Sequence, residues 1–137
     1  MKIYFAGSIR GGRLDQENYF KIIKHLQNYG EVLNEHVGKA DVFSFEKNFS
    51  DEEIYKRDLS WLKEADVVIA EISVPSLGVG YEIAKAEELN KKILCIYKKQ
   101  ENNNKISAMI NGNESIKVLG YRDLTEAFKY IDNFLKK

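Results

Sequence analysis

The sequence contains few of the residues from which covalent frameworks and metal sites are built. Among its 137 residues there are one cysteine, one proline and two histidines. A single cysteine excludes an internal disulfide framework and a cysteine-rich zinc site. Cys95 lies in the apolar run Ile93 to Tyr97, where a small buried side chain is the expected role. His25 and His36 have no partners at metal-ligand spacing, so we expect no metal site.

The chain also lacks an excess of charge and long apolar runs. It has 21 basic and 21 acidic residues and a formal net charge of zero at pH 7. Such a balance provides no general attraction for nucleic acid polymers or anionic lipid. It favours a small anionic ligand that is held by a local binding site. No apolar run approaches the roughly 20 residues that span a bilayer. Because the sequence opens directly on a strand pattern, without a targeting segment, we expect a cytoplasmic protein.

Short apolar runs alternate with segments of helical periodicity over residues 1–137, which we interpret as a single domain. This pattern predicts an α/β fold, a Rossmann-like or flavodoxin-like three-layer sandwich with a five-stranded parallel sheet. Ligands of such sheets bind beyond the carboxyl ends of the strands. The expected strands cover residues 3–6, 31–34, 66–72, 92–97 and 115–120, and the expected helices cover 19–29, 50–63, 79–90 and 124–135.

Two glycine-bearing loops follow predicted strands. The first, Gly7 to Arg13, contains two arginines and leads into a helix, where free backbone N–H groups favour an anion. Its spacing fits neither a Walker A motif nor G-x-G-x-x-G, so an ordinary P-loop or dinucleotide enzyme is disfavoured. The second loop, Pro75 to Gly80, leads to Glu82. We expect Glu82 in the first helical turn, where the helix dipole keeps a carboxylate ionised.

Several polar residues have ordinary roles when each is taken alone. Tyr4 is expected in the core, Asp66 at the start of a strand, and Glu82 as a stabilising acid near a helix terminus. His36 follows the second strand and is expected to be structural, whereas His25 is expected to be solvated. These residues acquire a functional interpretation only together.

Together the motifs resemble the 2′-deoxynucleoside 5′-monophosphate N-glycosidases (the Rcl family), which are related to the nucleoside 2-deoxyribosyltransferases. The matching segments occur in the same order as in the family. Residues 38–49 and the tail after Gly112 match weakly, and these regions bear on base preference. The matching blocks are Tyr4 to Arg13, Val32 to Val37, Trp61 to Glu71, Pro75 to Glu82 and Ile106 to Gly112.

The resemblance implies a homodimeric enzyme that cleaves the N-glycosidic bond of nucleoside monophosphates without a cofactor. It assigns Glu82 as the nucleophile, Tyr4 as its hydrogen-bond donor, and Asp66 to the sugar and to proton handling. It assigns the substrate phosphate to a set of small and basic residues, with Ser107 contributed by the partner subunit. The set is Gly7, Ile9, Arg10, Gly11, Ser76, Gly78 and Ser107.

The chemistry is consistent with these residue types. Breaking the C1′–N bond develops positive charge at C1′, which a carboxylate stabilises and can trap covalently. Two alternatives remain at this stage: a deoxyribosyltransferase that passes the sugar to another base, and a non-catalytic nucleotide sensor. Transferases of this kind act on unphosphorylated nucleosides and lack the arginine-bearing Gly-Gly turn, and a sensor has no use for Glu82, Tyr4 and Asp66 together.

Overall fold

The computed structural model describes residues 1–8, 16–100 and 106–136, and residues 9–15, 101–105 and 137 lie outside the description. The strands are β1 (Lys2–Ala6), β2 (Glu31–Val32), β3 (Val67–Glu71), β4 (Lys92–Lys98) and β5 (Lys117–Tyr121). The helices are α1 (Gln16–Leu26), the 3-10 helix η1 (Glu35–Gly38), α2 (Val42–Glu46), α3 (Asp51–Glu64), α4 (Leu77–Glu88), α5 (Ala108–Asn111) and α6 (Leu124–Leu135).

The strands form one parallel sheet in the order β2-β1-β3-β4-β5. The predicted α/β fold class and the five-stranded parallel sheet are therefore confirmed, with the strand order typical of flavodoxin-like proteins. In this order the chain leaves β1 in one direction to reach β2 and returns past β1 to reach β3. The switch point between β1 and β3 is the expected location for a ligand.

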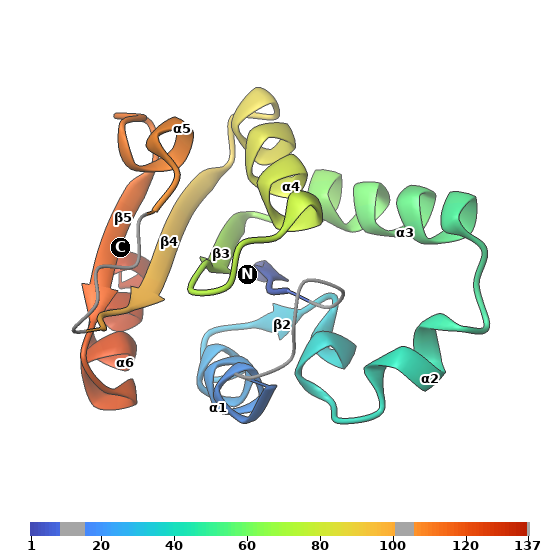
Figure 1. Ribbon diagram of the computed structural model, residues 1–137, viewed down its shortest axis with the longest axis horizontal. Helices are drawn as coiled ribbons and strands as arrows, with labels where there is room; N and C mark the ends of the chain where they lie inside the picture. Colours follow the sequence, from blue (N-terminus) through green and yellow to red (C-terminus); the bar gives the residue numbers. More distant parts are fainter. Residues whose placement is uncertain (9–15, 101–105, 137) are drawn as a thin grey trace.

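Helices cover both faces of the sheet, with α1 and α6 on one side and α3 and α4 on the other (Figure 1). Because side chains alternate along a strand, β1 contributes Ile3 and Phe5 to the core beneath α1 and α6. Tyr4 and Ala6 of the same strand join the core beneath α3 and α4. This alternation aims Tyr4 at the α4 side of the sheet.

Local signals set several element boundaries as predicted. Ser50 accepts a hydrogen bond from the backbone of Glu53, whose carboxylate accepts one from the backbone of Ser50, and this capping box starts α3. Helix α6 spans the predicted residues and packs its apolar stripe against the sheet. Within the described ranges, no helix has both the length and the apolar character needed to cross a membrane.

Four local expectations differ from the structure. Residues 36–49 were expected to be irregular, but this part of the chain forms most of η1 and all of α2. Strand β2, expected over residues 31–34, has only two residues because the chain turns toward η1 directly after it. Helix α4 begins at Leu77 rather than Val79, because the Ser76 hydroxyl caps it. His25 is not simply solvated: its Nε2 lies 2.7 Å from a carboxylate oxygen of Asp132, and its ring stacks on Phe128 where α1 meets α6.

Candidate active site

A cavity of about 640 Å³ opens between α3, α4 and the carboxyl ends of β1 and β3. This volume lies within the range of small-molecule sites. Its position agrees with the rule for parallel sheets, because Gly7 follows β1 and the segment 75–82 follows β3. The lining residues are Gly7, Glu46, Asp51, Ile54, Tyr55, Asp58, Leu59, Leu62, Pro75, Ser76, Leu77, Gly78, Val79, Tyr81 and Glu82.

Glu82, which lines this cavity, is hydrogen-bonded to the buried Tyr4. Tyr4 is 1% exposed in the middle of β1, and its hydroxyl donates a hydrogen bond to Oε2 of Glu82 on α4. The contact joins residues 78 positions apart, so it depends on α4 packing over β1. Burial and the neighbouring Glu82 raise the pKa of the Tyr4 phenol well above its usual value, which keeps this hydroxyl a donor.

Glu82 is the sixth residue of α4 and therefore lies in the second turn, not in the first turn as expected. The difference arises because the Ser76 cap starts the helix two residues earlier. Burial raises the pKa of the Glu82 carboxyl to about 8, and the hydrogen bond from Tyr4 acts in the opposite direction. Desolvation thus outweighs the helix dipole, and a carboxyl with this pKa retains its proton near neutral pH.

Three more acids line the same cavity, and one of them, Asp58 of α3, acts on Glu82 through its charge, although the sequence pattern did not single it out. Burial raises the pKa of Asp58, and the neighbouring Arg57 opposes that effect. The charge of Asp58 in turn raises the pKa of Glu82. A signal was present in the sequence, because Ile54, Asp58 and Leu62 follow one another at four-residue spacing. An acid inside an apolar helical stripe is unusual unless it faces a polar site.

Asp66 lies elsewhere. It is exposed and precedes β3, where its carboxylate accepts a 2.8 Å hydrogen bond from the backbone of Lys2. Both residues belong to the amino ends of their strands, whereas Asp58 and Glu82 line the cavity at the carboxyl side. The structure therefore does not bring Asp66 together with Glu82, and Asp58 is the cavity acid whose charge acts on Glu82.

The residues expected to hold phosphate are described in part. Gly7, Ser76 and Gly78 line the cavity, whereas Ile9, Arg10 and Gly11 lie outside the described residues. A Cβ on Gly7 would lie 2.8 Å from the Phe5 ring and 3.1 Å from Tyr19, so packing also requires glycine there. The Ser76 hydroxyl accepts a 3.3 Å hydrogen bond from the backbone of Val79. The N-terminus of α4, which favours anions, thus opens onto the cavity.

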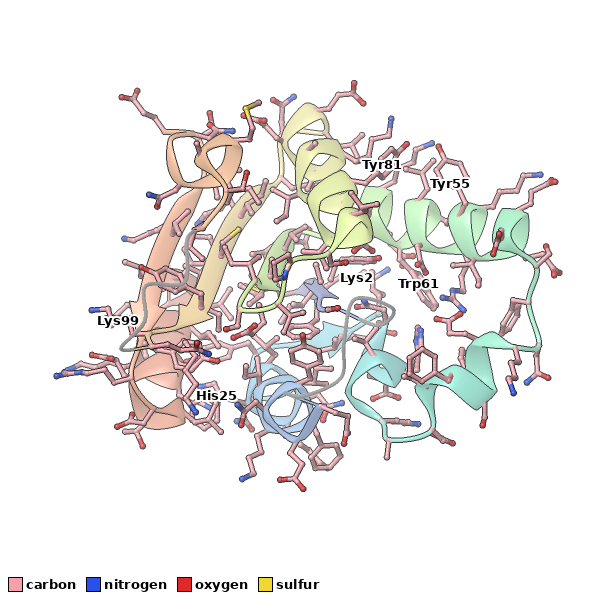
Figure 2. The ribbon with its side chains drawn as sticks, in the orientation of Figure 1. Lys2, His25, Tyr55, Trp61, Tyr81 and Lys99 are labelled. Atoms are coloured by element: carbon pink, nitrogen blue, oxygen red, sulfur yellow. The ribbon has the colours of Figure 1, made fainter. Side chains whose placement is uncertain are left out.

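Two tyrosines border the cavity between α3 and α4. Tyr55 and Tyr81 lie next to each other in Figure 2, with ring centroids 6.2 Å apart and hydroxyl oxygens 3.4 Å apart. They are 47% and 52% exposed, so they form a rim rather than part of the core. Sequence reasoning missed both, since exposed aromatics at helical spacing carry no distinct signal.

Ser107 is exposed and caps the short helix α5, accepting a 3.2 Å hydrogen bond from the backbone of Met109. It is not among the residues lining the cavity within this chain. In the described ranges, no group of three or more histidine, cysteine, aspartate or glutamate side chains is arranged to hold a metal ion.

Comparison of the sequence with profiles of known protein families identifies the family of this chain. The sequence profile described as nucleoside 2-deoxyribosyltransferase matches residues 3–133. The chain belongs to this family. The predicted resemblance is thereby confirmed.

Within the nucleoside 2-deoxyribosyltransferase family, several similar relatives carry hydrolase names. A Nematostella vectensis protein named "Putative 2′-deoxynucleoside 5′-phosphate N-hydrolase 1" is 50% identical over 116 residues, covering 83% of this chain and 78% of the relative. A Syntrophotalea carbinolica protein of the same name is 42% identical over 135 residues, covering 98% and 94%. The mouse protein named "5-hydroxymethyl-dUMP N-hydrolase" is 50% identical over 112 residues, covering 80% and 64%.

Solved structures of other proteins share the fold at low sequence identity. The CMP N-glycosidase BcmB of Clostridium botulinum superposes with a TM-score of 0.70 at 22% identity, covering 98% of this chain and 99% of that one. A 2-deoxyribosyltransferase from Bacillus psychrosaccharolyticus gives a TM-score of 0.65 at 20% identity, covering 98% and 96%. These likenesses support the same arrangement of sheet and helices.

Proposed function

We propose that the protein hydrolyses the N-glycosidic bond of 2′-deoxynucleoside 5′-monophosphates and releases the free base and deoxyribose 5-phosphate. The observation that carries the proposal is that Asp58 and Glu82 line one cavity of nucleotide size, with Glu82 held by a hydrogen bond from the buried Tyr4. The names of relatives at 42–50% identity support the same substrate class.

Glu82 is the proposed nucleophile. Its carboxylate attacks C1′ while the C1′–N bond breaks and the bonding electron pair leaves with the base nitrogen. The Tyr4 hydroxyl, which donates to Glu82 Oε2, stabilises the attacking carboxylate. Water then attacks C1′ of the glycosyl ester and restores Glu82, so that the two displacements give net retention.

Asp58 is the proposed acid and base of the two steps. Two carboxyls that interact in one cavity favour a state with a single shared proton. In the productive form this proton lies on Asp58, which gives it to the departing base and later removes a proton from the attacking water. We assign to Asp58 the role that the sequence resemblance gave to Asp66, because Asp66 lies at the amino ends of the strands, away from the cavity.

The 5′-phosphate is proposed to bind at Gly7, Ser76, Gly78 and the N-terminus of α4, with Ile9, Arg10 and Gly11 as further contacts predicted from the sequence. A phosphate fixed there anchors the sugar and orients C1′ toward Glu82. Because free nucleotides are soluble metabolites, we also propose a cytoplasmic enzyme.

We further propose a homodimer in which Ser107 reaches the phosphate of the neighbouring subunit. Leu77 beside the cavity is 96% exposed, and Met109, two residues after Ser107, is 84% exposed. Apolar side chains so exposed at a cavity mouth and on α5 are suited to a subunit contact. The alternative role for Ser107 is the helix cap alone.

The test is a panel of ribo- and deoxyribonucleoside monophosphates, with 5-hydroxymethyl-dUMP included, scored by chromatography for released base. Each nucleotide is paired with its nucleoside, and one series contains a second free base as acceptor. Hydrolysis predicts free base and sugar phosphate from at least one deoxynucleotide, whether or not an acceptor is present. Product that forms only with an acceptor would indicate a transferase, and binding without base release would indicate a sensor.

A further inference from the structure

A buried charged cluster borders the cavity and connects three segments that precede β3. Arg57 of α3 donates through Nη2 to both carboxylate oxygens of Glu46, at 3.0 and 3.3 Å. Glu46 also lies 2.9 Å from Nε2 of His36 in η1. Glu46 and His36 are each 8% exposed, so the ion pair is formed largely out of contact with water. A pair in such a place is strongly coupled to its neighbours.

Aromatic rings surround the guanidinium. Its central carbon lies 4.9 Å from the centroid of Trp61, 5.3 Å from Phe49 and 5.8 Å from Phe45. Figure 2 shows Trp61 on the side of α3 that faces α2. Rings at these distances attract a cation and limit its rotamers. Arg57 is therefore held in place independently of any ligand.

The same guanidinium reaches an acid of the proposed site. Nε of Arg57 donates to Oδ1 of Asp58 at 2.9 Å, and Nη2 lies 2.9 Å from the same oxygen. This two-point contact between adjacent residues on a helix fixes the Asp58 carboxyl on the cavity side, where it is one of the lining residues. A lysine, which has a single ammonium group, cannot reproduce that fork.

We propose that Arg57 is a positioning residue that orients Asp58 and sets how firmly the Asp58–Glu82 pair holds its shared proton. This inference rests on the proposed function, since it concerns the two acids of that site. The charge of Arg57 lowers the pKa of both Asp58 and Glu82, against the effect of burial. Among the described residues, the titratable groups that interact electrostatically with Asp58 are Arg57 on its own helix, Glu46 on α2, His36 in η1, Glu82 on α4 and Tyr4 on β1, while Asp51, Tyr55 and Tyr81 line the same cavity.

The experiment compares pH profiles of kcat/KM for the full-length wild type and the variants Arg57→Gln, Arg57→Lys and Glu46→Gln. Loss of the cation strengthens proton binding by the acid pair, so Arg57→Gln moves the whole profile to higher pH. We expect kcat/KM to fall about tenfold on the acid side of the optimum and to rise, relative to its peak value, on the alkaline side. This is the size of effect expected from removing one nearby charge. Arg57→Lys keeps the profile near its wild-type position but lowers kcat, because the fork is lost.

Glu46→Gln provides a test of opposite sign. The Glu46 charge raises the pKa of Asp58, so its removal moves the profile to lower pH. Arg122→Gln is the matched control: Arg122 is 78% exposed in its side chain and pairs with Glu126 at the start of α6, so its profile stays unchanged. A purely structural role for Arg57 predicts equal losses at every pH in Arg57→Gln and Arg57→Lys, which would overturn the inference.

A second measurement separates this inference from the proposed function. Carbon-detected NMR titration of the Asp58 and Glu82 carboxyls needs no turnover. Higher titration midpoints in Arg57→Gln than in wild type support the inference even if no nucleotide is hydrolysed. Unchanged midpoints in a folded Arg57→Gln protein refute it, even if the hydrolase activity is present. If Arg57→Gln does not fold, Glu46→Gln decides the question: midpoints that fail to fall refute the inference.

Discussion

The replacement Glu82→Gln probes a conflict between stability and function. Glutamine has nearly the same shape as glutamate and can accept the Tyr4 hydrogen bond, but it cannot ionise. The variant should lose at least about a hundredfold in turnover if Glu82 is a covalent nucleophile. It should also be more stable than wild type at alkaline pH, because ionisation of Glu82 in its buried position opposes folding.

The sign and size of this effect follow from the raised pKa. The folded protein holds the Glu82 proton up to about pH 8, whereas an unfolded chain releases it near 4.5, so wild-type stability falls as pH rises between these values. Between pH 6 and 8 the loss relative to Glu82→Gln is at most about 2 kcal/mol. Because the carboxyl opens onto a cavity that admits water, we expect roughly half of that, or about 3 °C in Tm.

The assay is urea unfolding of wild type and Glu82→Gln at pH 6 and pH 8. Glu88→Gln is the control, since Glu88 lies on the same helix with a side chain that is 69% exposed. The free energy of unfolding of Glu88→Gln should differ from that of wild type by the same amount at both pH values. If the difference in free energy of unfolding between Glu82→Gln and wild type is also the same at both pH values, burial does not raise the pKa of Glu82, and the reasoning about its environment is refuted.

Three further predictions concern the acids, the phosphate and the subunits. Asp58→Asn should lower kcat by at least about a hundredfold as an acid–base residue, whereas Asp66→Asn should stay near wild type in the same chromatographic assay. A larger loss in Asp66→Asn than in Asp58→Asn would return the role to Asp66. Hydrolysis of a deoxynucleoside should be at least about tenfold slower than that of its 5′-monophosphate, because the nucleoside lacks the anchoring phosphate; equal rates would contradict the phosphate site. Mixed dimers of Glu82→Ala and Ser107→Ala subunits, each impaired alone, should regain activity toward half of wild type, because one site then carries neither lesion. Failure to regain activity after demonstrated subunit exchange, or a monomeric protein at assay concentration, would exclude a shared site.

The elements of the fold could be predicted from local patterns in the chain. The runs that became β1, β3 and β4 are nearly continuously apolar, which predicts burial on both faces of a parallel sheet. The stripe of α6 and the capping box at Ser50 act within one helix and need no tertiary information. The family motifs, including Glu82 and Tyr4, depend on sequence order alone and were found in the same way.

The identity of the second acid was decided only by tertiary structure. Asp66 and Asp58 are both acids close to β3 in sequence, but Asp66 enters the strand at its amino end and Asp58 faces the cavity from α3. The state of Glu82 was likewise beyond sequence reasoning. Helix position alone suggested an ionised carboxylate, whereas the folded chain leaves Glu82 partly buried beside Tyr4 and Asp58. Desolvation and the charge of a neighbouring acid depend on packing between segments far apart in the chain, and together they exceed the local field of the helix.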